Sequence, residues 1–104
     1  TRAVAPSRKQ QRQSEAEKRR RLKPYTDRVR SAERAMDKTQ SRLEELESAL
    51  AETTLYTDTG RKEELAGLMK DQAGLRSALE QQEADWLEAN EALDQASQSA
   101  DLSS

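Results

Sequence analysis

The chain lacks several residue types on which many catalytic and metal sites depend. Its 104 residues include no cysteine, no histidine and no phenylalanine. Without cysteine no disulfide can form. Without cysteine and histidine, the usual zinc sites and the Ser–His and Cys–His catalytic pairs are excluded. The three glycines form no phosphate-binding loop, because none is followed by Lys-Ser or Lys-Thr. We therefore expect a chain that is not an enzyme and that needs no cofactor of its own.

Apolar residues are also scarce. Hydrophobic residues make up 33% of the chain and charged residues 37%. So little apolar surface cannot fill a thick globular core, but it can fill a narrow seam between long helices. No apolar run is long enough to span a bilayer or to act as a signal peptide, so no membrane contact is expected. The absence of cysteine fits a reducing, cytoplasmic location. A start at Thr1 rather than at Met is expected of a fragment of a larger protein.

The net charge of −2 hides an uneven distribution of charge along the chain. Residues 1–30 hold 11 basic and 3 acidic residues, whereas residues 31–104 hold 7 basic and 17 acidic residues. The first segment therefore has a net charge of +8 and the second a net charge of −10. This asymmetry predicts a basic N-terminal arm with an anionic partner.

Residues suited to a helical seam recur at steps of three and four in two runs, as in a heptad repeat. The first run is Leu22, Tyr25, Val29, Ala32, Met36, Thr39, Leu43, Leu46, Leu50 and Thr53; the second is Leu65, Leu68, Gln72, Leu75, Leu79, Gln82, Trp86, Ala89, Leu93 and Ala96. Asp, Thr and Gly between the runs favour a turn. A connection this short makes the two helices run antiparallel. The pattern predicts an all-α fold, an antiparallel two-helix coiled-coil hairpin with a basic, partly disordered N-terminal arm.

The predicted register pairs seam residues whose numbers add up to 118, so that Trp86 packs over Ala32 and the centre falls at Thr59 in the turn. Gln72 and Gln82 occupy seam positions, either because the thin seam stays partly hydrated or because they fix the register. Alanines occupy four flanking positions: Ala35, Ala49, Ala78 and Ala92. They reflect either helix propensity or a docking face.

We divide the chain into six segments. Residues 1–13 are expected to be a disordered basic linker, and residues 14–23 a basic helical or frayed segment that Ser14 would cap. Proline disfavours helix in the residue before it, so a break or kink is expected near Lys23. The first coiled-coil helix then spans residues 24–54, the turn 55–60, the second helix 61–97 and a disordered tail 98–104.

The basic arm is the one feature of the sequence with functional chemistry. Clustered cations bind phosphates by releasing counterions, without reading a base sequence. The predicted nucleic-acid-binding residues are Arg8, Lys9, Arg12, Lys18, Arg19, Arg20, Arg21, Lys23, Arg28 and Arg30. The alternative is a solvated linker that charge keeps soluble. The carboxylates at solvent-facing heptad positions indicate solvated charge rather than acid–base catalysis.

Two segments resemble parts of a known family. Leu55-Tyr56 precedes Arg61-Lys62-Glu63-Glu64-Leu65, and Ala84-Asp85-Trp86-Leu87-Glu88-Ala89 lies in the expected second helix. Together with the basic Lys18 to Lys23 and Pro24, this order resembles the C-terminal coiled-coil domain of ABC-F ATPases, in particular the YheS-like and Uup-like branches. The resemblance covers residues 8–97.

The resemblance implies a parent protein with two ATP-binding cassettes and no membrane domain, acting on ribosomes as a translation factor. ATP and Mg²⁺ would belong to that parent, and this chain would be its non-catalytic C-terminal domain. The implied partner of the basic arm is ribosomal RNA or DNA. The alternatives are a coiled coil that docks on a ribosomal protein or on the parent's cassettes, or a plain spacer.

Overall fold

The computed structural model describes residues 7–102 and shows a rod built of helices. Its elements are α1 (Arg8–Leu50), the short α2 (Thr54–Thr57), the 3-10 helix η1 (Thr59–Arg61) and α3 (Lys62–Leu102), with no strand in the described span. The predicted all-α class is confirmed. The molecule measures 87 × 21 × 15 Å, and its radius of gyration is 23.5 Å, whereas a compact chain of this length has about 13 Å. Neither long helix within this span carries an apolar stretch that suits a bilayer.

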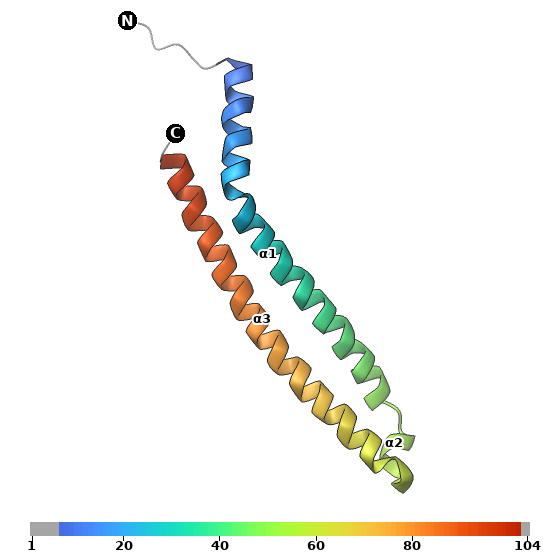
Figure 1. Ribbon diagram of the computed structural model, residues 1–104. Coiled ribbons are helices and arrows are strands. Elements are labelled where there is room, and N and C mark those ends of the chain that lie inside the picture. Colours follow the sequence, from blue (N-terminus) through green and yellow to red (C-terminus); the bar gives the residue numbers. More distant parts are fainter. Residues whose placement is uncertain (1–6, 103–104) are drawn as a thin grey trace, which may run out of the picture.

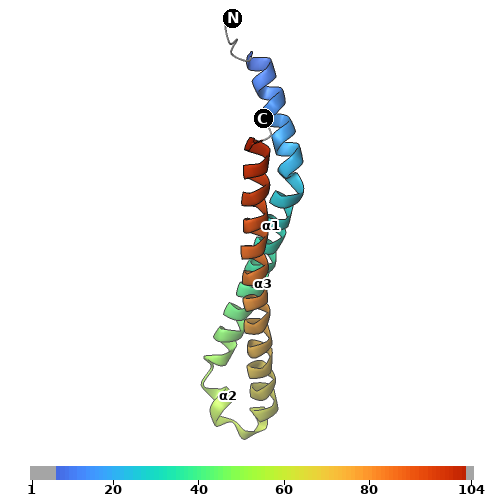
Figure 2. The same cartoon turned by 90° about the vertical axis from the view of Figure 1, so that its left-hand side faces the viewer.

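The two long helices contact each other along most of their length (Figure 1). Lys18 pairs with Asp101, the Arg28 guanidinium lies 3.8 Å from the Glu88 carboxylate, and the Trp86 indole N–H donates to Glu33 at 3.3 Å. The α3 partner number falls as the α1 number rises, so α3 returns alongside α1. Figure 2 shows α1 passing across α3 in the view turned by 90°.

The seam between the helices is thin. Val29, Thr39 and Leu43 on α1 and Ala89 on α3 are buried, while most other seam residues are half-buried. The buried Thr39 hydroxyl donates to the Ala35 carbonyl at 3.0 Å, which satisfies it within its own helix. Two helices alone cannot enclose a side chain from every direction, so few seam residues are fully buried.

The start of α1 differs from the prediction. Residues 8–13 are helical rather than disordered, and the helix begins after Ser7 instead of Ser14 or Pro24. The Ser7 hydroxyl accepts from the Gln10 backbone N–H at 3.2 Å, and the Gln10 side chain accepts from the Ser7 N–H at 2.9 Å. This reciprocal pair satisfies two free donors at the helix start. Residues 1–6 of the predicted linker lie outside the described residues.

Contrary to the prediction, the helix does not break at Pro24. It lies inside α1, where its missing N–H leaves the Arg20 carbonyl without its usual helical bond. Figure 1 shows α1 bending in its light-blue to teal stretch. Once a helix is nucleated, each further residue adds a hydrogen bond. The hydrogen bonds of the turns on both sides therefore keep α1 continuous through Pro24. Of the two predicted outcomes, a kink and a break, only the kink occurs.

The connection between the long helices is more ordered than a simple turn. The first long helix ends at Leu50 rather than at residue 54, and α2 and η1 fill the connection that was predicted as a turn. Leu55 is 2% exposed and is the most deeply buried large side chain, and the Tyr56 hydroxyl donates to the Leu50 carbonyl at 2.7 Å. The Asp58 carboxylate accepts from the Gly60 N–H at 2.9 Å. These contacts make the tip a folded cap.

Arg61 joins the two sides of this tip. Its guanidinium donates to Glu64 at 2.9 Å, to Glu52 at 3.0 Å and to the Thr54 hydroxyl at 2.8 Å. The hydrogen bonds from Arg61 lower the pKa of both carboxylates, and the same bonds raise the pKa of the guanidinium. At the other end α3 continues to Leu102 rather than ending at residue 97, so residues 98–102 are helical. The last two residues of the predicted tail lie outside the described span.

Candidate functional site

All the basic residues predicted to bind phosphates lie on α1. They are Arg8, Lys9, Arg12, Lys18, Arg19, Arg20, Arg21, Lys23, Arg28 and Arg30, and only Lys18 is half-buried while the others are exposed. Because α1 is continuous through Pro24, each of these residues has a fixed direction around one helix axis. The helix therefore distributes the basic side chains of the arm over distinct sides, which a disordered linker could not do.

One side of α1 collects half of these cations. The residues follow one another at steps of three and four, the spacing that keeps side chains on one side of a helix. We call this surface the basic stripe; it consists of Lys9, Arg12, Arg19, Lys23 and Arg30, with the small residues Ala16 and Thr26 at the intervening steps. At 1.5 Å per residue the stripe is about 32 Å long. It places five cations in a row on a rigid support.

A shallow depression of about 470 Å³ lies along this stripe. Its lining comes from α1 alone: Ala16, Arg19, Arg20, Leu22, Lys23, Thr26, Asp27 and Arg30. Ala16 and Thr26 are half-buried and lie low between the longer arginine and lysine side chains. Four of the eight lining residues are cations and one is an acid, so the depression suits an anionic group.

Asp27 partly neutralises the depression. Its carboxylate accepts a hydrogen bond from the Lys23 ammonium at 2.6 Å, one helical turn away. This hydrogen bond is the main reason that the pKa of Asp27 is lowered, with further help from the charges of Arg30 and Arg34. Asp27 therefore stays ionised near neutral pH and orients Lys23. Arg19, Arg20 and Arg30 form no ion pair with any residue that the structure describes.

Other predicted site residues do not join the stripe. Lys18 is bound to Asp101, and Arg28 faces Glu88, so carboxylates of α3 occupy both cations. Arg21 points to the side where α1 meets α3, beside Ala100. Sequence reasoning missed these carboxylates because the predicted register was applied only to seam residues and Asp101 was assigned to a disordered tail. The Lys23–Asp27 pair, in contrast, was detectable from its spacing of four residues.

The first turns of α1 project beyond α3. Lys18 pairs with Asp101, one residue before the end of α3, and Figures 1 and 2 both show the blue end of α1 extending past the red end of α3. The described part of α3 therefore places no carboxylate beside Lys9 and Arg12. The projecting turns carry exposed cations, which an extended anionic partner can approach from most directions.

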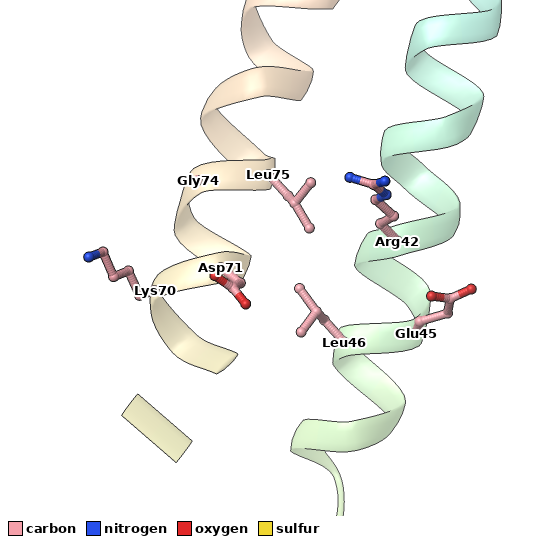
Figure 3. Close-up of a pocket in the computed structure, with 7 residues that line it drawn as sticks. All are labelled: Arg42, Glu45, Leu46, Lys70, Asp71, Gly74 and Leu75. Carbon is pink, nitrogen blue, oxygen red and sulfur yellow. The ribbon is translucent and has the colours of Figure 1, made fainter. Parts of the chain in front are cut away.

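A larger depression, about 740 Å³ in size, lies between the long helices and nearer the tip. Figure 3 shows Leu46 and Leu75 pointing toward each other across it, with the Arg42 guanidinium beside Leu75. Lys70 points away from it in the same view. No residue predicted to bind nucleic acid lines it. Two basic and two acidic residues line it, so it offers a packing surface rather than an anion site.

Comparison with known proteins gives no assignment. No family model, no curated protein and no solved structure matches this chain. A functional interpretation therefore rests on the residues of the chain itself, and first on the basic side of α1.

Proposed function

We propose that this chain binds nucleic-acid phosphates through the basic stripe of α1, and that the paired helices present this stripe at one end of a stiff rod. The observation that carries the proposal is the continuity of α1 through Pro24. It aligns cations on both sides of the proline, from Lys9 to Arg30, on a single side of the helix. A row of aligned cations matches the regular row of charges on a nucleic-acid backbone.

The chemistry of the stripe favours phosphates over other anionic partners. No aromatic residue lies among its cations, so bases have no stacking platform and recognition depends on the backbone. The stripe also lacks the large apolar side chains that a helix inserts into a membrane surface. Binding of this kind does not depend on base sequence and weakens steeply with salt. Ribosomal RNA and DNA both fit this chemistry.

The rod itself we infer to be an antiparallel two-helix coiled-coil hairpin in the register that pairs residue numbers adding up to 118. The Trp86 indole contacts Glu33, the residue after Ala32, where this register places it. The buried Val29 and Ala89 belong to one layer of the same register. Such a hairpin acts as a lever, because a load applied at its tip moves the basic end as one body.

We further propose that the chain is the C-terminal domain of an ABC-F ATPase. The two segments that carry the resemblance both have structural roles: Leu55 anchors the tip, and Trp86 joins α3 to α1. In this proposal the parent's cassettes bind ATP and Mg²⁺, and this chain adds a nucleic-acid contact on the ribosome or on DNA. In this proposal the tip residues stabilise one end of the rod, and the basic residues bind nucleic acid at the other end.

The test is fluorescence anisotropy with a labelled ribosomal RNA hairpin and a labelled DNA duplex, each titrated with the full chain at two salt concentrations. If the five cations of the stripe each contact one phosphate of B-form DNA, the logarithm of affinity should fall against the logarithm of salt with a slope of about −4 to −5. The double variant Arg19→Glu, Arg30→Glu should reduce this slope by about two and weaken binding to all sequences alike.

A matched control separates the stripe from net charge. Lys62→Glu, Arg76→Glu makes the same charge change on α3, far from the stripe, and both of these residues are exposed. It should bind nearly as well as the unchanged chain. Equal losses in the two double variants would show that only overall charge matters, and no binding of either nucleic acid at low salt would refute the proposed function.

A further inference from the structure

Three depressions lie in a row along one side of the rod. They measure about 740, 480 and 300 Å³, and each is lined by residues of both α1 and α3. We call this surface the grooved side. Its flanking residues on α1 are Arg21, Arg28, Ala35, Arg42 and Ala49, and those on α3 are Asp71, Ala78, Asp85, Ala92 and Ser99. Each set repeats every seven residues, which keeps it beside the seam along the whole rod.

Large and small residues alternate across the grooved side. The register of the two helices sets a charged residue against a small one at every level. The levels are Arg21 with Ser99, Arg28 with Ala92, Ala35 with Asp85, Arg42 with Ala78, and Ala49 with Asp71. All the long cations lie on α1 and both acids lie on α3. From Arg28 onward, the longer residue therefore lies on α1 at one level and on α3 at the next.

The middle depression has a buried polar atom without a partner. The Gln82 side-chain oxygen is buried and accepts no hydrogen bond, and Gln82 lines this depression together with Ala32, Ala35 and Arg28. Trp86 does not fill the space, because its indole N–H is bound to Glu33 on the opposite flank of the seam. A buried acceptor without a donor is costly, so a group that brings a donor to this depression is favoured.

We propose that a second copy of this chain covers the grooved side, with the two rods parallel and related by a two-fold axis along their length. In this arrangement α1 of each copy lies over α3 of the other. Arg28 then meets Ala92, and Arg42 meets Ala78, so each long side chain enters a hollow. The guanidinium of Arg28, which lies 3.8 Å from Glu88 of its own copy, also comes near the carboxylate of Asp85 in the other copy, which supplies charge complementarity.

The opposite orientation is disfavoured by charge. If the second rod ran antiparallel, α1 would lie over α1 and α3 over α3, so the arginines of both copies would share one half of the interface and the aspartates the other half. Like charges brought together in an interface are repulsive. The sequence of the grooved side therefore selects the parallel dimer.

The available area suits a stable dimer. Arg21 and Ala49 lie 28 residues apart on α1, which corresponds to about 42 Å of helix. The second dimension of the rod is 21 Å, so the footprint is close to the roughly 800 Å² per partner of a standard interface. The result is a four-helix assembly, which buries the thin seam of each hairpin more completely. This inference stands independently of nucleic-acid binding.

The test is sedimentation equilibrium of the full chain over a wide concentration range. The chain should sediment with twice the mass of one chain. Ala78→Arg places a cation opposite Arg42 of the second copy and should return the chain to a monomer with unchanged helicity by circular dichroism. Ala84→Arg is the matched control, because Ala84 is an exposed residue of α3 away from the seam. It should remain a dimer.

Charge exchange tests the pairing without relying on a bulky side chain. Asp85→Arg alone should dissociate the dimer, and Asp85→Arg combined with Arg28→Asp should restore it. The chain contains no cysteine, so Thr59→Cys allows a single spin label at each tip. Parallel rods should give an inter-label distance far below the 87 Å length of the rod. A monomer at every concentration, a dimer unaffected by Ala78→Arg and Asp85→Arg, or tips a rod length apart would overturn the inference.

Discussion

Leu55 gives the most direct test of how the tip is held. It lies in the four-residue helix α2, which packs on α3, and its side chain is 2% exposed. A helix of one turn has almost no stability of its own, because nucleation costs more than its few hydrogen bonds return. Packing of Leu55 therefore provides the main reason for α2 to fold. We expect Leu55→Ala to destabilise the whole rod.

The size of the effect follows from burial. Removing a fully buried leucine side chain to the β-carbon loses its transfer free energy and leaves a cavity, which together cost about 2–5 kcal/mol. The tip borders solvent and can partly collapse, so we expect a value of about 3 kcal/mol. Small domains are stable by about 5–15 kcal/mol, so this loss is a large share of the total. Leu87, which is 57% exposed on α3, provides the matched control, and Leu87→Ala should change stability by less than about 0.5 kcal/mol.

The assay is urea unfolding followed by far-ultraviolet circular dichroism, with both variants measured against the unchanged chain at one protein concentration. A fixed concentration matters because self-association would add to the apparent stability. The expected result is a lower midpoint for Leu55→Ala at a similar slope, and no shift for Leu87→Ala. Equal small shifts for the two leucines would refute the reasoning, since the tip would then be held by Arg61 and its carboxylates alone.

Two further predictions concern the bend and the tip charges. Pro24→Ala restores a backbone donor to the Arg20 carbonyl and should raise stability by about 1–3 kcal/mol in urea unfolding, while the salt slope of nucleic-acid binding stays unchanged because the stripe keeps its cations. The Arg61 hydrogen bonds lower the pKa of Glu52 and Glu64 below the ordinary value of 4.5, so their stabilisation is fully present above that pH and disappears as the pH falls through the lowered values. The stability difference between the unchanged chain and Arg61→Ala should therefore be constant above about pH 5 and shrink as the pH falls further.

The sequence was sufficient for the fold class because two signals coincided. Steps of three and four marked long helices, and the low apolar content excluded a thick core. The basic arm was also predictable, since clustered arginines and lysines are visible without a structure. The division of that arm into sides was not predicted, because it required knowing that α1 continues through Pro24.

The errors have a common physical origin. A proline rule describes the local cost at one residue, whereas the turns before and after Pro24 contribute hydrogen bonds over a much longer span. Helical continuity is decided by this sum. The Ser7–Gln10 capping box was visible in the sequence, but the expectation of disorder in residues 1–13 hid it. Leu55 was assigned to a turn, since nothing in a short apolar–aromatic pair reveals that a loop residue packs on α3.

The same continuity gives α1 two independent surfaces. Lys23 of the basic stripe and Arg21 of the grooved side are two residues apart, and so are Arg30 and Arg28. Two residues correspond to a rotation of about 200° on a helix with 3.6 residues per turn, so the two surfaces face nearly opposite directions. A nucleic acid on the stripe and a second copy on the grooved side therefore do not compete for space.

Because the proposed dimer is parallel, it places both stripes at the same end of the assembly, and one long phosphate backbone can reach both. Linking two sites in this way raises affinity beyond that of either alone. A helix broken at Lys23 would separate Lys9, Arg12 and Arg19 from Arg30, so the basic stripe would no longer follow one side of a single helix.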